Sequence, residues 1–240
     1  MAGFIPDLYS IPWFLTMFSH VFPLHKIFHL WDSLLLGNAS YPLCVGLAVL
    51  YQLRAQLMES QFNECILLFS DMPAVDIDSV VSASISIFKT TPASLTWRQH
   101  QSADHEENPL QMTAVPIHTL KRERVGRMSG EELLQLISTD SVCCVDVRPG
   151  DEFKLGTVAG AVSLPFDQAL NESGDLIAGG HTLEEAKNAG KIIVIMSSVR
   201  DDTAQTFAEK LLSLEFPRLA TLHAGVEVFY NAGVLVVPHV

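Results

Sequence analysis

The chain has 240 residues, of which 48% are hydrophobic and 18% are charged, and its formal net charge at pH 7 is −12. This length suits one large domain or two small ones, and the hydrophobic fraction is sufficient for packed cores. Acidic residues outnumber basic ones in both halves, which excludes the basic surface expected of a protein that binds nucleic acid or an anionic membrane.

Residues 1 to about 95 show helical periodicity that no strand alternation interrupts. Pro12 is predicted to open the first helix, because proline is tolerated at the first helical position, and Phe22-Pro23 is predicted to end it. Four further helices are expected, at Leu24–Leu36, Tyr41–Glu59, Glu64–Phe69 and Asp76–Phe88. This part of the chain is therefore predicted to be an all-helical bundle or a piece of one.

Two aromatic motifs lie in the first two predicted helices. Residues 12–18 read P-W-F-L-T-M-F and residues 26–32 read K-I-F-H-L-W-D, with Gly37 following. Aromatic residues at helical spacing are usually just core, but the order and spacing of these two motifs resemble the late motif of TBC domains, the Rab GTPase-activating fold. We also expect the carboxylate after the second tryptophan to accept a hydrogen bond within the bundle. The residues to which the resemblance gives structural roles are Trp13, Phe14, Phe18, Trp31 and Asp32.

TBC domains accelerate GTP hydrolysis with an arginine from I-x-x-D-x-x-R and a glutamine from Y-x-Q, both of which precede the late motif. Neither motif occurs in the eleven residues before Pro12, and Tyr51-Gln52 follows the late motif instead. We therefore expect the chain to start midway through a TBC domain, either as a shortened isoform or as a truncated product. On this reading it supplies neither of the residues that stabilise phosphoryl transfer.

The second half of the chain is predicted to be an α/β domain. Arg98–Asn108 is polar and charged, so residues 96–124 are read as a linker between a helical domain at 1–95 and a second domain at 125–240. Ser129 and Glu132 form a capping box that opens a helix. Apolar runs at Ser141–Val147 and Ile192–Ile195 predict buried strands, and Thr203–Leu212 has helical spacing. The alternation favours a mostly parallel sheet, so the predicted fold class is α plus α/β.

The segment after the first buried strand contains a recognisable signature. Residues 146–153 read D-x-R-x-x-x-E-F and residues 156–161 read G-T-V-x-G-A. This order resembles the N-terminal signature of rhodanese-like domains, and Met196–Asp202 falls where such domains carry the active-site loop C-x-x-x-x-[RK]. Two later segments, Ala224-Gly225-Val226 and Asn231-Ala232-Gly233-Val234, resemble the closing elements G-G-[IV] and A-G-[LV], so the resemblance covers roughly residues 125 to 240. It implies structural roles for Asp146, Arg148, Glu152, Phe153, Gly156, Gly160 and Ala161.

Three positions depart from the rhodanese pattern. Ser197 stands where the family has its persulfide-forming cysteine, Asp202 where it has the loop-closing arginine or lysine, and Thr157 where it usually has histidine. Sulfur transfer needs a thiolate nucleophile, so we expect a degenerate loop at Ser197, Arg200 and Asp202, with Asp202 as the side-chain N-cap of the next helix. A hydrolase with Ser197 as nucleophile and His223 as base is an alternative that lacks the usual G-x-S-x-G elbow.

The cysteines and the apolar segments limit which metal sites and which cellular locations are expected. Cys44, Cys65, Cys143 and Cys144 match no zinc motif, and we expect neither a metal nor a cofactor. Cys143 and Cys144 are expected to point to opposite faces of one strand. No signal peptide opens the chain, and no apolar run reaches the roughly 20 residues of a bilayer span, so a cytoplasmic location is expected.

The two resemblances together imply a non-catalytic Rab-directed regulator or scaffold in vesicle trafficking and growth signalling. Its implied partner is a Rab-type small GTPase or a larger trafficking complex. A GTPase-activating protein is the alternative, and it would need the upstream half of the TBC domain. A sulfurtransferase is less favoured because Ser197 cannot carry sulfane sulfur.

Overall fold

The computed structural model describes residues 5–70, 72, 75–96, 108, 110–171, 175–177, 179–230 and 232–238. Most of the first half of the predicted linker, residues 97–107 and 109, lies outside the described residues. The chain divides into two compact units, Met1–Thr91 and Pro92–Val240, and the short 3-10 helix η1 (Ala93–Thr96) belongs to the second of them. Each unit is described below by itself.

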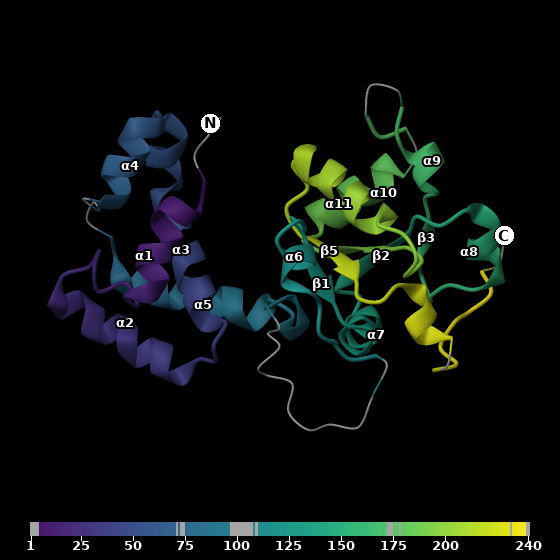
Figure 1. The fold of residues 1–240 in the computed structure, drawn as a ribbon, viewed down its shortest axis with the longest axis horizontal. Helices are drawn as coiled ribbons and strands as arrows, with labels where there is room; N and C mark the ends of the chain where they lie inside the picture. Colours follow the sequence, from purple (N-terminus) through teal and green to yellow (C-terminus); the bar gives the residue numbers. More distant parts are fainter. Residues whose placement is uncertain are drawn as a thin grey trace. The chain divides into compact units, whose positions relative to one another are not determined.

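The first unit is helical, as predicted (Figure 1). The predicted bounds of α2 (Leu24–Leu36) and α3 (Tyr41–Glu59) are confirmed. Helix α4 (Phe62–Ser70) is three residues longer than predicted, and α5 (Ile77–Thr90) begins one residue later and ends two residues later. In α5 the carboxylate of Asp76 accepts from the backbone N–H groups of Asp78 and Ser79, which fixes the start of that helix. The helices are α1 (Asp7–Leu15), α2 (Leu24–Leu36), α3 (Tyr41–Glu59), α4 (Phe62–Ser70) and α5 (Ile77–Thr90).

The prediction for the first helix was wrong at both ends. Helix α1 begins at Asp7, whose carboxylate suits the positive end of the helix, so Pro12 lies inside the helix. The helix stops at Leu15 because Met17 and Phe18 adopt positive φ angles of 47° and 66°. The N–H of Phe18 then donates to the carbonyl of Trp13 at 2.8 Å, a return bond typical of a helix C-terminus.

Aromatic packing and one hydrogen bond hold the two halves of the TBC-like motif together, although α1 ends at Leu15. Trp13 and Phe18 are completely buried, and their ring centroids lie 5.8 Å apart. The indole N–H of Trp31, on α2, donates to the carbonyl of Met17 at 2.8 Å, so the two halves of the motif are bonded to each other. Phe14 is half-buried against the same core. Asp32 is exposed, and its carboxylate accepts no hydrogen bond from any described residue, so the hydrogen bond that we expected there is not found in the described part of the bundle.

The second unit contains a five-stranded parallel sheet in the order β1-β5-β4-β2-β3, which confirms the predicted fold class (Figure 1). Its strands are β1 (Gly126–Met128), β2 (Val142–Asp146), β3 (Val162–Ser163), β4 (Ile192–Met196) and β5 (Leu219–Leu222). Its helices are α6 (Ile117–Leu120), α7 (Gly130–Ser138), α8 (Gly150–Leu155), α9 (Phe166–Ala169), α10 (Gly180–Asn188), α11 (Thr203–Ser213) and the 3-10 helix η3 (Val226–Phe229).

Two hydrophobic cores lie on the two faces of this sheet. Helices α9, α10 and α11 pack over one face, and α7 and η3 pack over the other. Cys143 belongs to the first core and Cys144 to the second, which confirms that these cysteines point to opposite faces. All five residues of β4 are buried, as expected for a central parallel strand. Since Asp146 pairs with Met196, the ends of β2 and β4 meet at one edge of the sheet.

The capping box at Ser129 is only half formed. The hydroxyl of Ser129 accepts from the N–H of Glu132 at 3.2 Å, as predicted. The carboxylate of Glu132 instead accepts from the backbone N–H groups of Ala93 and Ser94, at 2.7 and 2.9 Å, and from the Ser94 hydroxyl. The N–H of Ser129 donates to that same hydroxyl at 3.1 Å. Glu132 therefore joins the start of η1 to the start of α7.

Candidate functional site

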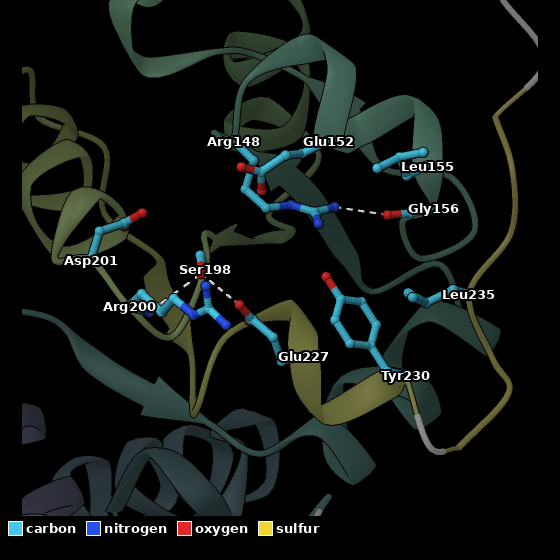
Figure 2. A pocket seen from close by; sticks show the side chains of 10 residues that line it. All are labelled: Arg148, Glu152, Leu155, Gly156, Ser198, Arg200, Asp201, Glu227, Tyr230 and Leu235. Atoms are coloured by element: carbon cyan, nitrogen blue, oxygen red, sulfur yellow. Dashed lines mark hydrogen bonds between the residues drawn. The ribbon is translucent and has the colours of Figure 1, made fainter.

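A cavity of ≈ 610 Å³ lies at the carboxyl edge of the sheet, where parallel α/β folds place their binding sites. Three segments form it: the residues around α8, the loop after β4, and η3 with the residues that follow it. Figure 2 shows the side chains of these segments facing one another across the cavity. The lining residues are Arg148, Glu152, Leu155, Gly156, Ser198, Arg200, Asp201, Glu227, Tyr230 and Leu235.

Asp146 and Arg148 form a buried ion pair beneath this cavity. Nε of Arg148 donates to Oδ1 of Asp146 at 3.0 Å, and Nη2 donates to Oδ2 at 2.7 Å. The backbone N–H of Arg148 also donates to Oδ1, and Nη2 donates to the carbonyl of Gly156 at 2.8 Å. Burial lowers the pKa of Arg148, but the hydrogen bond and the charge of Asp146 outweigh it, so the pKa is raised overall. The pair thus ties the end of β2 to the turn after α8.

Thr157 completes the shell around Asp146. Its hydroxyl donates to Oδ2 of Asp146 at 2.9 Å, and the side chain is buried. Its backbone exchanges two hydrogen bonds with Val236, at 3.0 and 2.8 Å. Threonine therefore supplies one donor to the buried carboxylate at a position where the family usually has histidine.

The other signature residues lie around this ion pair. Glu152 is exposed on the cavity wall, and Phe153 on the same helix is half-buried. Gly160 has a φ of 74°, a left-handed conformation that favours glycine. Ala161 packs against the core beneath η3.

Ser197 is buried at the start of the loop after β4, with 5% of its surface exposed. Its hydroxyl donates to the carbonyl of Ser198 at 3.2 Å, and its own carbonyl accepts from the N–H of Val226 at 3.0 Å. Arg200 is exposed, and its N–H donates to the hydroxyl of Ser198 at 3.3 Å. Among the described residues, no cationic side chain hydrogen-bonds to the Ser197 hydroxyl.

The prediction that the Asp202 side chain caps α11 was wrong, although the residue does lie at the N-cap position. Asp202 occupies the N-cap position of α11, but its side chain accepts no capping hydrogen bond from the described part of the helix. The carboxylate of the preceding residue, Asp201, accepts from the N–H of Thr203 at 3.0 Å instead. Two adjacent aspartates at a helix start are equally good capping residues in sequence, and the backbone angles decide between them.

His223 is not placed as a base for Ser197. Its Nε2 lies 3.1 Å from the N–H of Thr113 and 2.8 Å from the hydroxyl of that threonine. Since a backbone N–H can only donate, Nε2 is the acceptor, and Nδ1 carries the proton of the neutral ring. Burial, and then the charge of Arg127, lower the pKa of His223, while Glu123 opposes them. The geometry therefore favours a buried neutral histidine that holds Thr113, and it offers no support for a serine hydrolase.

Sequence reasoning missed the side chains that come from the end of the chain. Glu227 and Tyr230 line the cavity from η3 and the residue that follows it, between the two closing elements of the rhodanese resemblance, which did not include them. The sequence signal for Glu227 was a carboxylate just after a glycine turn, but the partners of that carboxylate lie 28 and 29 residues earlier in the chain.

Within the described residues, no group of three or more histidine, cysteine or acidic side chains is arranged to hold a metal ion. No described helix is both long and apolar enough to cross a bilayer.

The parallel sheet of the second unit and the loop after β4 define a rhodanese-like domain. A family model for the rhodanese-like domain matches residues 129–232. A second family model, for the Rab-GTPase-TBC domain, matches residues 2–58. Both predicted resemblances are therefore confirmed, and the chain combines a TBC segment with a rhodanese-like domain.

The most informative relatives carry both parts. The proteins named TBC domain-containing protein kinase-like protein from Mus musculus and from Homo sapiens are each 40% identical to this chain. Each alignment is 275 residues long and covers 98% of this chain. The protein of that name from Dictyostelium discoideum is 29% identical over 222 residues, covering 92% of this chain and 20% of its own length. The chain spans 31% of the length of the two mammalian relatives.

Solved structures are more distant. The BH2092 protein from Bacillus halodurans is 21% identical, with a TM-score of 0.37, and the match covers 50% of this chain and 81% of that one. SseA from Escherichia coli, a 3-mercaptopyruvate sulfotransferase, is 15% identical, with the same TM-score, and the match covers 46% of this chain and 49% of that one.

Proposed function

We propose that this chain is part of a Rab-directed regulator whose two modules bind partners and perform no catalysis of their own. The matches to a Rab-GTPase-TBC domain and to a rhodanese-like domain support a regulator related to Rab GTPase-activating proteins. A Rab-type small GTPase, or a larger trafficking complex that contains one, is the partner that this relationship favours. We place its action in the cytoplasm, in vesicle trafficking and growth signalling.

The observation that carries the non-catalytic part of this proposal is the side chain at the start of the loop after β4. A persulfide carrier needs a thiolate, which a serine hydroxyl cannot replace. Ser197 occupies that position, and its hydroxyl is bonded to the neighbouring carbonyl of Ser198. The thiols in the same sheet, Cys143 and Cys144, belong to the cores on its two faces and do not line the cavity.

A second candidate, a GTPase-activating protein, is favoured by the match of residues 2–58 to the Rab-GTPase-TBC domain. An arginine finger contributes roughly 10³ to 10⁵ in the rate of GTP hydrolysis. The printed sequence contains neither the arginine nor the glutamine motif before Pro12. This candidate therefore requires the chain to be joined to a segment that supplies both residues.

The test uses the full 240-residue chain with a panel of purified Rab GTPases loaded with GTP, and it measures phosphate release together with binding. We expect at least one Rab to bind without faster hydrolysis. Stimulation of the size given by an arginine finger would contradict the proposal. The Arg54→Ala variant would then show whether that exposed arginine of α3 is responsible. Absence of binding across the whole panel would also contradict it.

A further inference from the structure

The first three residues of the loop after β4, Ser197, Ser198 and Val199, are hydrogen-bonded to η3, which follows β5. The N–H of Val226 donates to the carbonyl of Ser197 at 3.0 Å. The hydroxyl of Ser198 donates to Oε1 of Glu227 at 2.5 Å, and the N–H of Val199 donates to Oε2 at 3.0 Å. Figure 2 shows the Glu227 carboxylate pointing at the loop rather than into the open part of the cavity.

The turn before η3 is built to allow this approach. Ala224 and Gly225 have φ angles of 58° and 70°. A Cβ on Gly225 would lie 2.4 Å from the nitrogen of Val199 and 2.6 Å from Oε2 of Glu227, closer than real Cβ contacts allow. Only glycine at this position lets the loop and the carboxylate come together.

We propose that Glu227 is the built-in ligand of this loop, and that its carboxylate fills the position where the loop would otherwise bind an external oxyanion. A loop that leads from a strand into a helix presents N–H groups that favour an anion. Here the N–H of Val199 and the hydroxyl of Ser198 already hold a carboxylate with both of its oxygens. The inference rests on this geometry alone and goes beyond the proposed function, because it holds whether or not either module catalyses a reaction.

A tethered ligand also competes well against a free one. An intramolecular group acts at an effective concentration on the order of millimolar or above, so a weakly bound external anion cannot displace it at low concentration. The carboxylates around the cavity act in the same direction, because they repel a free anion. Glu152 and Asp201 line it beside Glu227, and the guanidinium of Arg148 is already paired with Asp146. Arg200, which also lines the cavity, is the cation that acts against them.

The experiment compares the natural chain with Glu227→Ala by two-dimensional amide NMR during titration with sodium acetate, with sodium chloride at matched ionic strength as the salt control. Acetate carries the same carboxylate as the side chain that the substitution removes. We expect a saturable shift of the Val199 amide in Glu227→Ala and none in the natural chain. The matched control is Glu152→Ala, which removes a carboxylate from the same cavity but no hydrogen bond to the loop, and it should behave like the natural chain.

Two results would overturn the inference. One is a Val199 amide that responds to acetate equally in the natural chain and in Glu227→Ala. The other is a folded Glu227→Ala variant whose Val199 amide does not respond. If Glu227→Ala does not fold, Glu227→Gln keeps the shape and removes the charge. Hydrogen exchange at the Val199 amide should then be faster than in the natural chain, and unchanged exchange would overturn the inference.

Discussion

The hydroxyl of Thr157 donates to the buried carboxylate of Asp146 at 2.9 Å, so one of the residues that depart from the family pattern is hydrogen-bonded to the Asp146–Arg148 ion pair that the pattern builds. Asp146 is completely buried, and its two oxygens accept from Arg148 and Thr157. A buried charge of this kind is tolerated only when its hydrogen bonds are complete. The threonine thus preserves the architecture of the site independently of any chemistry at Ser197.

Thr157→Val should destabilise the second unit by about 1–3 kcal/mol, because it removes a donor from a buried charged acceptor at nearly constant volume. Thr157→Ser keeps the hydroxyl and should cost clearly less. Hydrogen exchange of the β4 amides under native conditions measures the difference. Equal losses for the two variants would mean that packing, rather than the hydrogen bond, is what Thr157 contributes.

The two aspartates before α11 should differ in their contribution to stability. Asp201→Ala removes the acceptor of the Thr203 N–H and should cost about 0.5–2 kcal/mol, the usual range for a lost cap. Asp202→Ala removes an exposed side chain without a capping bond and should be close to neutral. Urea unfolding followed by circular dichroism compares the pair. A larger loss for Asp202→Ala would show that the predicted cap exists in solution.

Much of the fold could be predicted because its signals are local. The periodicity of Leu24–Leu36 and Tyr41–Glu59 gave the bounds of α2 and α3, and the apolar run at Ile192–Ile195 located the central strand β4. The first helix could not be predicted in this way. The left-handed angles at Met17 and Phe18 arise because burying Phe18 and bonding Trp31 to Met17 outweigh the continuation of the helix.

The site was predictable only where its residues are close in sequence. Asp146 and Arg148 lie two residues apart, and their signature indicated them. The contacts of Glu132 with Ser94 and of Glu227 with Ser198 span 38 and 29 residues, and no periodicity encodes them. The choice between Asp201 and Asp202 depends on backbone angles at one turn, which residue type alone does not determine.

The stability of the second unit should fall as the pH decreases below about 6.5, the ordinary pKa of histidine. Burial lowers the pKa of His223 in the folded state, so the folded chain binds fewer protons than the unfolded chain in this range. The stabilisation is therefore present above the unfolded pKa and is lost as the pH falls through the folded pKa. His223→Gln should weaken this dependence in urea midpoints measured between pH 7 and pH 5.

The matched control for that series is His181→Gln, which removes an exposed histidine from α10. Its midpoints should follow the pH dependence of the natural chain. If His223→Gln and the natural chain lose stability equally with falling pH, His223 is not the residue responsible.

Cys143 and Cys144 should resist alkylation in the folded chain. Burial raises the pKa of both thiols, and burial followed by the influence of Cys143 raises the pKa of Cys144 to about 12. Because the thiolate is the reactive form, iodoacetamide at pH 8 should modify these residues only after denaturation. Peptide mass mapping of native and denatured samples provides the measurement. Rapid native labelling of Cys144 would contradict the buried placement.

The central claim is that the rhodanese-like loop holds no nucleophile that can accept sulfur. The most direct test is intact mass spectrometry of the natural 240-residue chain after incubation with thiosulfate, with Ser197→Ala treated in parallel. We predict that neither protein gains a sulfane sulfur atom, because a serine hydroxyl forms no persulfide, Cys144 is buried, and the half-buried Cys143 does not line the cavity. A natural chain that gains one sulfur atom, removable by cyanide, would contradict the claim.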